Sequence, residues 1–212
     1  MKIGVFDSGK GGTTVLEAIQ KILPNEEYKY IGDSENCPYG EKSDEELLGI
    51  VCKIVDELKD WGATLIVIAC NTATARCIDK LRELYPKIEF VGTEPAIKLA
   101  VATGAENILV MATPGTVESE RLHELVRDNK MNNQKIELLA CAGLADVIEK
   151  DENVDEVLSR LLEGKKNYDV VVLGCTHYSL IRDRIQKYFP EALFIDGNDG
   201  VASRVQQIVQ KQ

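Results

Sequence analysis

The sequence predicts an α/β fold of two similar three-layer lobes with mostly parallel sheets, related by a pseudo-two-fold axis, with the active site in the cleft between them. Short runs of apolar β-formers alternate with amphipathic helical patterns along the chain, which is typical of parallel sheets covered on both faces. Two of these runs, Ile66–Ala73 and Val171–Tyr178, contain a cysteine followed by polar residues, 105 positions apart in a chain of 212 residues. The same shift places residues 3–8 on residues 108–113. This period favours an internal duplication, although two α/β halves of similar fold could also produce it.

The first half of the chain predicts four strands and the helices that connect them. Ser43 followed by Glu46 is a capping box, and Gly62 marks the end of the helix that it starts. The expected elements, in order, are a strand at 3–6, a helix at 12–23, a strand at 28–31, an irregular segment at 32–40, a helix at 43–60, a strand at 65–69, a helix capped by Asn71 or Thr72 and running to Leu84, and a strand at 87–91.

The second half repeats this rhythm. Its expected elements are a helix opened by 93–95 and running through 101, a strand at 108–111, a turn at 112–115, a helix at 116–128, a strand at 135–140, helices at 144–149 and 154–162, a strand at 170–173, a helix at 180–188, a strand at 193–195 and a helix at 200–209. We expect an N-terminal lobe of residues 1–94 plus about 196–212, carrying Asp7, Ser8 and Cys70, and a C-terminal lobe of residues 95–195, carrying Cys175 and His177. The sequence between them has no linker rich in proline, glycine or serine, so we expect the lobes to be tightly joined.

Charge and composition narrow the class of protein. The formal net charge of −10 argues against nucleic acid or an anionic membrane as a partner, but a local site could still bind an acidic small molecule. No apolar run approaches the roughly 20 residues of a membrane span. The chain opens directly into a strand, so we expect no signal peptide. Six cysteines without a Cys-x-x-Cys pair, together with only two histidines, predict reduced thiols in a cytoplasmic protein and no metal site.

A glycine-rich turn follows the first strand, from Asp7 to Thr14. It lacks the second Gly-Lys-Ser/Thr step of a P-loop and the third glycine of a dinucleotide fingerprint. We therefore interpret it as a tight strand-to-helix turn that exposes Asp7 and Ser8 at the carboxyl edge of the sheet. The Cys37–Gly40 loop is either a plain connection or a lip that faces the substrate.

Ligands of such folds bind outside the carboxyl ends of the strands. Most free cysteines are simply small buried hydrophobes, and Cys37, Cys52, Cys77 and Cys141 fit that interpretation. Cys70 and Cys175 differ, because both occupy matched places at a strand end and are followed by hydrogen-bonding residues. The residues expected at these strand ends are Asp7, Ser8, Cys70, Thr113, Thr116 and Cys175.

A thiol at a helix amino terminus has its thiolate favoured by the helix dipole. Lowering a pKa from about 8.5 to 7 requires roughly 2 kcal/mol. His177 could accept the Cys175 proton, or it could be a capping residue, and Asp7 could assist Cys70. If the two lobes face one another, one thiolate can remove a proton from a carbon while the opposing thiol protonates its other face. This arrangement would invert a stereocentre.

At these residues the chain closely resembles glutamate racemases of the aspartate/glutamate racemase superfamily. The matching motifs are FDSGKGG at 6–12, CPYG at 37–40, ACNTAT at 69–74 and GCTHY at 174–178, with a weaker match in ATPGT at 112–116. The resemblance implies cofactor-independent racemisation of glutamate by two thiols, supplying D-glutamate for peptidoglycan. It implies that Cys70 and Cys175, aided by Asp7 and His177, are catalytic. It also implies substrate contacts from Asp7, Ser8, Tyr39, Gly40, Asn71, Thr72, Thr113, Thr116, Thr176 and His177.

The chain departs from this family in being shorter, mainly around residues 116–168 and at the carboxyl terminus. Glu149 falls near the position of the family's helper glutamate. One alternative is racemisation of aspartate or another small amino acid, because one methylene in the substrate changes its binding by only ~1–3 kcal/mol. Another is a non-catalytic amino-acid-binding protein. A pyridoxal enzyme is not favoured, because no lysine stands in a persuasive site. We expect a homodimer without a nucleic-acid or membrane partner.

Overall fold

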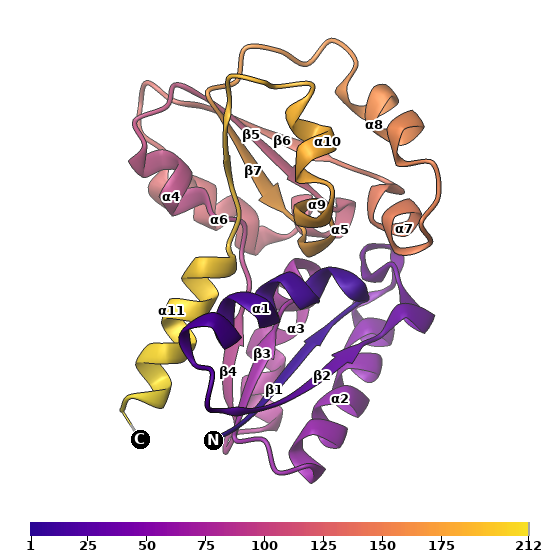
Figure 1. Cartoon of the computed structure of the whole chain (residues 1–212), viewed down its shortest axis with the longest axis vertical. Helices are drawn as coiled ribbons and strands as arrows, with labels where there is room; N and C mark the ends of the chain where they lie inside the picture. Colours follow the sequence, from indigo (N-terminus) through magenta and orange to yellow (C-terminus); the bar gives the residue numbers. More distant parts are fainter. Residues whose placement is uncertain (212) are drawn as a thin grey trace.

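The computed structural model describes residues 1–211 and has two α/β lobes, one above the other in Figure 1. Each lobe contains a four-stranded sheet, with strand order β2-β1-β3-β4 in the first and β6-β5-β7-β8 in the second. Every strand pair is parallel. The predicted fold class of two similar lobes with parallel sheets is confirmed.

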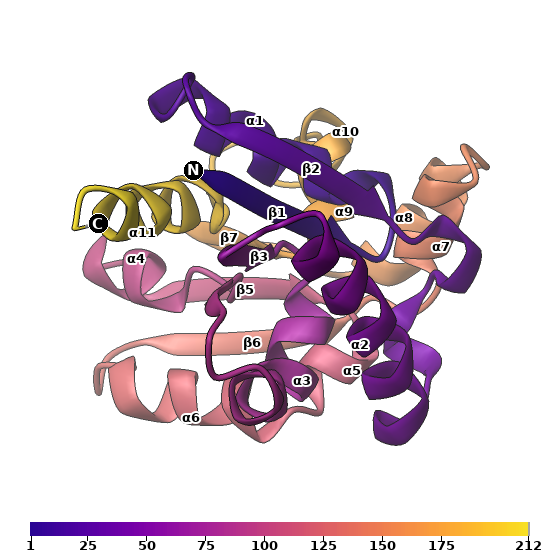
Figure 2. The same cartoon turned by 90° about the horizontal axis from the view of Figure 1, so that it is seen from below.

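The first lobe is built on β1 (Lys2–Asp7), β2 (Glu27–Gly32), β3 (Leu65–Ile68) and β4 (Glu89–Gly92). Successive side chains of a strand point to opposite faces, so Leu65 and Val67 pack in one layer while Ile66 and Ile68 pack in the other. The first layer is covered by α1 (Thr13–Ile22) and α11 (Asn198–Val209), the second by α2 (Asp44–Asp60) and α3 (Asn71–Leu84). Figure 2 shows these helices around the sheet from below.

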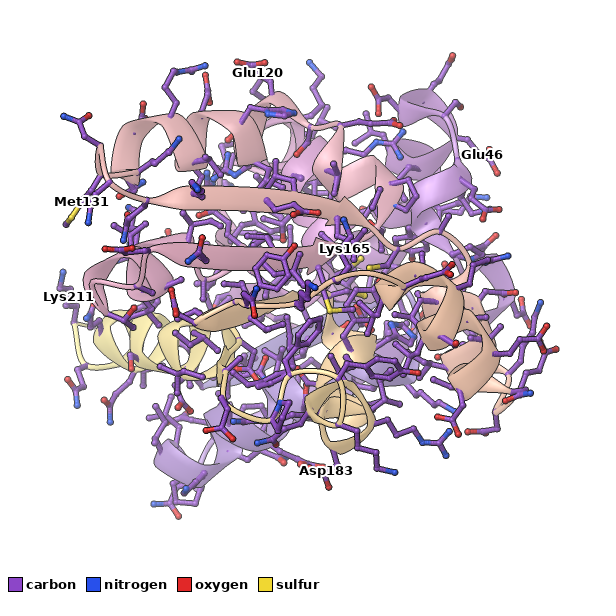
Figure 3. The ribbon with its side chains drawn as sticks, turned by 90° about the horizontal axis from the view of Figure 1, so that it is seen from above. Glu46, Glu120, Met131, Lys165, Asp183 and Lys211 are labelled. Carbon is purple, nitrogen blue, oxygen red and sulfur yellow. The ribbon has the colours of Figure 1, made fainter. Side chains whose placement is uncertain are left out.

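The second lobe is built on β5 (Asn107–Ala112), β6 (Lys135–Ala140), β7 (Val170–Gly174) and β8 (Leu193–Ile195). One face packs against α4 (Ile97–Ala102) and α6 (Glu120–Asn129). The other face packs against α7 (Leu144–Glu149), α8 (Val154–Leu162), α9 (Thr176–Leu180) and α10 (Arg182–Gln186). Figure 3 looks onto this lobe from above, and the labelled side chains of Glu120 and Asp183 point outward from opposite flanks.

Short 3-10 turns and one short helix lie where the lobes meet. They are η1 (Lys10–Gly12), η2 (Ser34–Asn36) and η3 (Tyr39–Glu41) in the first lobe and α5 (Pro114–Val117) in the second. The chain crosses between the lobes twice, after β4 and again before α11, so the last helix packs beside α1 although it closes the sequence. No helix within residues 1–211 combines the length and the apolar character that crossing a membrane requires.

Three expected helices are wrong in extent. The helix predicted at 116–128 divides into α5 and α6, because the Ser119 side chain caps α6 by accepting from the Leu122 amide at 3.3 Å. The helix predicted at 180–188 begins earlier, as α9, and is interrupted at Ile181, whose backbone is not helical (φ −115°, ψ 19°). The helix predicted to open at 93–95 begins at Ile97, after a non-helical Ala96.

Candidate active site

Four strands of the two sheets deliver polar side chains to the edge where the lobes face one another. In the first lobe, β1 ends at Asp7 and β3 is followed by Cys70. In the second lobe, β5 is followed by Thr113 and β7 by Cys175. The carboxyl ends of parallel strands share one edge of a sheet, which is where ligands bind in such folds. All four side chains are buried, with Cys70 and Cys175 only 5% and 7% exposed. The lobes therefore enclose both thiols in this structure.

Cys70 is itself the N-cap of α3, in place of the predicted Asn71 or Thr72. Its Sγ accepts a hydrogen bond from the Ala73 amide at 3.5 Å and donates to the Ser8 hydroxyl at 3.7 Å. A thiol can occupy this position because the first amides of a helix lack partners within the helix. No hydrogen bond joins Cys70 to Asp7 among the described residues, so the nearest polar support of this thiol is Ser8 and a backbone N–H.

Cys175 lies in a different environment, at the start of a chain of three side chains. Its Sγ is 3.9 Å from Nδ1 of His177, and Nε2 of His177 is 2.8 Å from a carboxylate oxygen of Glu149. Glu149 also accepts from the Lys10 amide at 2.9 Å and from the Ser34 hydroxyl. Burial raises the pKa of Glu149, but these hydrogen bonds outweigh it and leave that pKa below its usual value.

The Glu149 carboxylate fixes the proton of the His177 ring. An ionised carboxylate only accepts hydrogen bonds, so the neutral ring places its proton on Nε2, facing Glu149. Nδ1 is then an acceptor that faces the Cys175 thiol. His177 is 1% exposed and does not cap a helix, since the N-cap of α9 is Cys175. The geometry thus suits His177 to receive the Cys175 proton.

The ionisation of both thiols differs from the sequence-based expectation. Burial raises the pKa of Cys70 to about 12. Burial also raises the pKa of Cys175 well above its usual value, and a negative charge on Cys70 or Asp7 raises it further. The helix-start amides lower both values but do not overcome the loss of water. Both cysteines therefore rest as thiols, and the predicted lowering of the thiol pKa is wrong for this closed arrangement.

Asp7 joins the two lobes through its carboxylate. It accepts from the Gly12 amide at 2.8 Å and, across the cleft, from the Thr176 hydroxyl at 3.3 Å. Burial raises its pKa, and the nearby His177 and these hydrogen bonds reduce the effect only in part. Gly11 packs so closely here that a Cβ would lie 2.6 Å from the His177 amide nitrogen. The glycine-rich turn therefore packs directly against the start of α9, where Thr176 donates to Asp7.

Three threonine hydroxyls form a second contact across the cleft. Thr72 Oγ1 is 2.8 Å from Thr113 Oγ1 and 3.3 Å from Thr116 Oγ1, and the last two are 3.0 Å apart. All three side chains are buried. Nearby, a Cβ on Gly40 would lie 3.4 Å from Thr113. The structure therefore brings these predicted site residues together at the lobe boundary.

The loop at 37–40 is a lip of this boundary, and the Tyr39 hydroxyl is engaged within the first lobe. That hydroxyl donates to Asp33 at 2.7 Å, and the ring packs in the core of the first lobe. Arg76 fixes the loop by donating to the carbonyl oxygens of Tyr39 and Lys42, at 3.4 and 2.7 Å. The sequence analysis missed Arg76, since a single arginine on a helix carries no signal of such a contact.

Asn71 is buried, and its side-chain oxygen has no hydrogen-bond partner among residues 1–211. A buried acceptor without a partner destabilises a protein by about 1–3 kcal/mol, so a ligand N–H would satisfy it. Lys10 and Ser34 were also missed by the sequence analysis. They hold Glu149 from the opposite lobe, and only the folded structure shows that contact.

Comparison with known sequences identifies similar proteins over nearly the whole chain. The family described as Asp/Glu/hydantoin racemase matches residues 3–205. A glutamate racemase of Clostridium botulinum is 38% identical over 99% of this chain and 84% of its own length. A glutamate racemase of Aliarcobacter butzleri is 41% identical, over 97% of this chain and 82% of its own length.

Solved structures give the same result for the fold. The crystal structure of Escherichia coli glutamate racemase in complex with L-glutamate and the activator UDP-MurNAc-ala matches with a TM-score of 0.90, at 33% identity over 100% of this chain and 83% of that one. Glutamate racemase of Francisella tularensis in complex with D-glutamate matches with a TM-score of 0.83, at 29% identity over 99% of this chain and 81% of that one.

Proposed function

The chain belongs to the Asp/Glu/hydantoin racemase family, and from this we propose that it interconverts L- and D-glutamate by moving protons between two thiols, without a cofactor. It is an amino-acid racemase, an isomerase, and glutamate is the substrate named for its relatives. D-glutamate made in this way would serve peptidoglycan synthesis, as the resemblance to glutamate racemases implies.

The observation that carries the proposal is the pair Cys70 and Cys175. They occupy equivalent strand ends in two lobes of the same strand order, and both lie in the closed boundary between those lobes. They are near enough that a charge on Cys70 raises the pKa of Cys175. A site that removes a proton from one face of a carbon and returns one to the other face needs two such groups on opposite sides.

The proposed reaction uses the helpers that each thiol contacts. Cys175 passes its proton to Nδ1 of His177, and Glu149 stabilises the imidazolium that forms. The Cys175 thiolate then takes the α-proton, and the electron pair stays on the α-carbon, delocalised into the adjacent carboxylate. The Cys70 thiol donates its proton to the opposite face, which gives the other enantiomer. His177 then releases its extra proton to solvent, which leaves a neutral ring and a Cys70 thiolate beside Ser8 and the Ala73 amide.

The remaining contacts suit the charged groups of glutamate. The free oxygen of Asn71 can accept from the substrate ammonium, for which Asp7 supplies a carboxylate. The hydroxyls of Ser8, Thr72, Thr113, Thr116 and Thr176 can donate to its carboxylates. We assign the backbone of Tyr39 and Gly40 to the same binding surface, because the Tyr39 hydroxyl is engaged by Asp33.

We also propose that the enzyme acts in the cytoplasm as a homodimer, without nucleic acid or membrane as a partner. All six cysteines are free thiols, as is usual in a reducing compartment. The net charge of −10 opposes binding to nucleic acid or anionic lipid. Size-exclusion chromatography with light scattering tests the dimer, and a monomer at micromolar concentration would contradict it.

Circular dichroism of each enantiomer of glutamate and aspartate, in heavy water and without added cofactor, tests the reaction. We expect the glutamate signal to decay to zero from either side while deuterium enters at the α-carbon. If aspartate is racemised faster than glutamate, aspartate is the substrate. If the signal of no amino acid changes, the result favours a non-catalytic binding protein.

Serine variants test the roles of the two thiols. Cys70→Ser and Cys175→Ser should each abolish racemisation, because a hydroxyl is far less acidic than a thiol. Cys52→Ser, on the outer layer helix α2, is the matched control and should keep activity. Full activity in either of the first two variants would contradict the two-thiol mechanism.

A further inference from the structure

A third cysteine lies beside the His177–Glu149 pair. The Cys37 Sγ, a Glu149 carboxylate oxygen and a His177 ring nitrogen all lie within 4.8 Å of one another. We propose that these three side chains form an inhibitory site for a thiophilic divalent cation, of which Zn²⁺ is the representative. The inhibition rests on the proposed racemase function, whereas the binding of the metal does not.

The three ligands come from both lobes. Cys37 lies between η2 and η3 of the first lobe, while Glu149 ends α7 and His177 lies in α9 of the second. In Figure 1 the 33–41 loop rises toward α7 at the lobe boundary. Such separation in the sequence explains why no ligand spacing could predict the site. Cys37 is partly exposed and the Glu149 side chain is 11% exposed, so a cation can reach the cluster from the Cys37 side, whereas His177 is almost fully buried.

The distances suit a tetrahedral ion after a small adjustment. Zinc bonds of about 2.3 Å to sulfur and about 2.0–2.2 Å to nitrogen and oxygen place neighbouring ligand atoms roughly 3.3–3.6 Å apart. The present Nε2 to carboxylate distance of 2.8 Å is that of a hydrogen bond, so the metal would replace the shared proton and widen the pair. A cysteine, a histidine and a carboxylate form a donor set that zinc accepts, with a fourth position left for water.

Neighbouring groups already hold these ligands in place. The Lys10 amide and the Ser34 hydroxyl donate to Glu149, which is the outer support that zinc ligands in proteins usually have. The two lysine ammonium groups near the cluster are both paired, Lys10 with Asp151 at 2.6 Å and Lys150 with Asp146 at 2.8 Å. The carboxylates of Asp7 and Asp146 add negative charge near Cys37. A dication is therefore favoured at this point.

Bound metal would stop the reaction through the tautomer of His177. Coordination at Nε2 moves the single ring proton to Nδ1, so the nitrogen facing Cys175 becomes a donor and cannot accept the thiol proton. Three bonds form, from the metal to sulfur, nitrogen and oxygen. The Cys37 thiol releases its proton to solvent, and the ring proton moves between nitrogens, without any change in oxidation state. The metal would also tie the 33–41 loop to α7 and hold the lobes closed.

Cobalt is the direct probe of the site, because Co²⁺ bound by a thiolate has a charge-transfer band in the near ultraviolet and visible bands typical of tetrahedral geometry. Reduced full-length protein titrated with CoCl₂ should show both bands at one equivalent, and ZnCl₂ should displace them. Cys37→Ser should remove the charge-transfer band, while Cys52→Ser, Cys70→Ser and Cys175→Ser should retain it. A band that survives in Cys37→Ser, or that disappears in Cys70→Ser or Cys175→Ser, would overturn the assignment.

Racemisation at buffered free Zn²⁺ tests the inhibition separately. The inhibition constant for Zn²⁺ should be at least about tenfold higher in Cys37→Ser than in the wild type, and it should be unchanged in Cys52→Ser. The activity of each variant is compared with its own activity without metal. Equal inhibition of Cys37→Ser and the wild type would overturn the proposal. If the metal-free enzyme racemises nothing while the cobalt band still depends on Cys37, the proposed function fails and the metal site stands.

Discussion

Replacing Gly11 by alanine should inactivate the enzyme without unfolding it. The η1 turn meets the start of α9 at this residue, and a Cβ there would lie 2.6 Å from the His177 amide nitrogen and 2.7 Å from Thr176 Oγ1. Ordinary van der Waals contact begins at about 3.4 Å, so the backbone of α9 must withdraw by roughly 0.8 Å. This strain is steric, since the Gly11 backbone is not in the left-handed region.

The displacement acts on groups that the proposed reaction needs. Thr176 donates to Asp7, and the His177 ring lies between Cys175 and Glu149. A misplacement of about 1 Å in a catalytic constellation reduces the rate about 100-fold. We therefore expect kcat/KM for glutamate to fall by about two orders of magnitude, in both directions of racemisation.

Gly49→Ala is the matched control. This glycine is exposed within α2, and a Cβ there meets nothing within 4 Å. The same substitution should leave the kinetics unchanged and stabilise the helix by about 0.5–1 kcal/mol. Circular dichroism of the substrate gives the rates, and thermal melts show whether each variant is folded. Gly11→Ala with kcat/KM within threefold of the wild type would refute the reasoning.

Three further changes test other parts of the structure. Asp7→Asn should abolish racemisation yet raise the melting temperature at pH 7, by about 2–4 °C for each kcal/mol gained. Burial raises the folded-state pKa of Asp7 above its ordinary 3.8, so the ionised group destabilises the fold above that raised pKa. The gain should disappear below pH 3.8, which calorimetry across pH checks, and a lower melting temperature at pH 7 would contradict it. Leu58→Ala, in the fully buried core of the first lobe, should cost about 2–5 kcal/mol in urea unfolding and leave kcat nearly unchanged; a cost below 1 kcal/mol would count against close packing there. Glu149→Gln should slow racemisation about 10- to 100-fold, with unequal losses of kcat in the two directions, measured from each pure enantiomer.

The fold followed from the sequence because its signals are local and repeated. Strands such as 65–69 are apolar on both faces and lie between amphipathic helices, and only a parallel sheet between helical layers buries both faces. Short elements were harder to predict. The five residues of α9 contain too few turns for a helical period, and the break between α5 and α6 depends on the Ser119 cap.

The sequence predicted the site residues only where they directly follow a recognisable strand. Cys70 and Cys175 belong to such ends, and their matched spacing pointed to a shared cleft. Their ionisation did not follow, because the helix-start effect is visible in the sequence while the loss of water depends on how the lobes close. The contacts of Glu149 with Lys10 and Ser34 join positions more than 100 residues apart, and nothing in the local sequence marks them.

The two lobes share a fold, but the groups that assist Cys70 and Cys175 differ. The equilibrium between the two enantiomers determines how that difference can be measured. Cys70 contacts a hydroxyl and an amide, whereas Cys175 contacts His177 and, through it, the Glu149 carboxylate. A hydrogen bond to a charged group contributes about 1.5–3 kcal/mol, which is roughly a 10- to 100-fold change in rate. L- and D-glutamate have equal free energies, so kcat/KM must remain equal in the two directions for every variant.

The unequal helpers must therefore appear as opposite changes of kcat and KM. In Glu149→Gln the imidazolium loses its carboxylate, so the form with a Cys175 thiolate becomes less populated than the form with a Cys70 thiolate. For the enantiomer that reacts with the Cys175 thiolate, kcat should then fall further than for the other enantiomer. Its KM should be lower than that of the other enantiomer by the same factor. Equal losses of kcat from both enantiomers would show that Glu149 only shapes the site and does not tune one of its two bases.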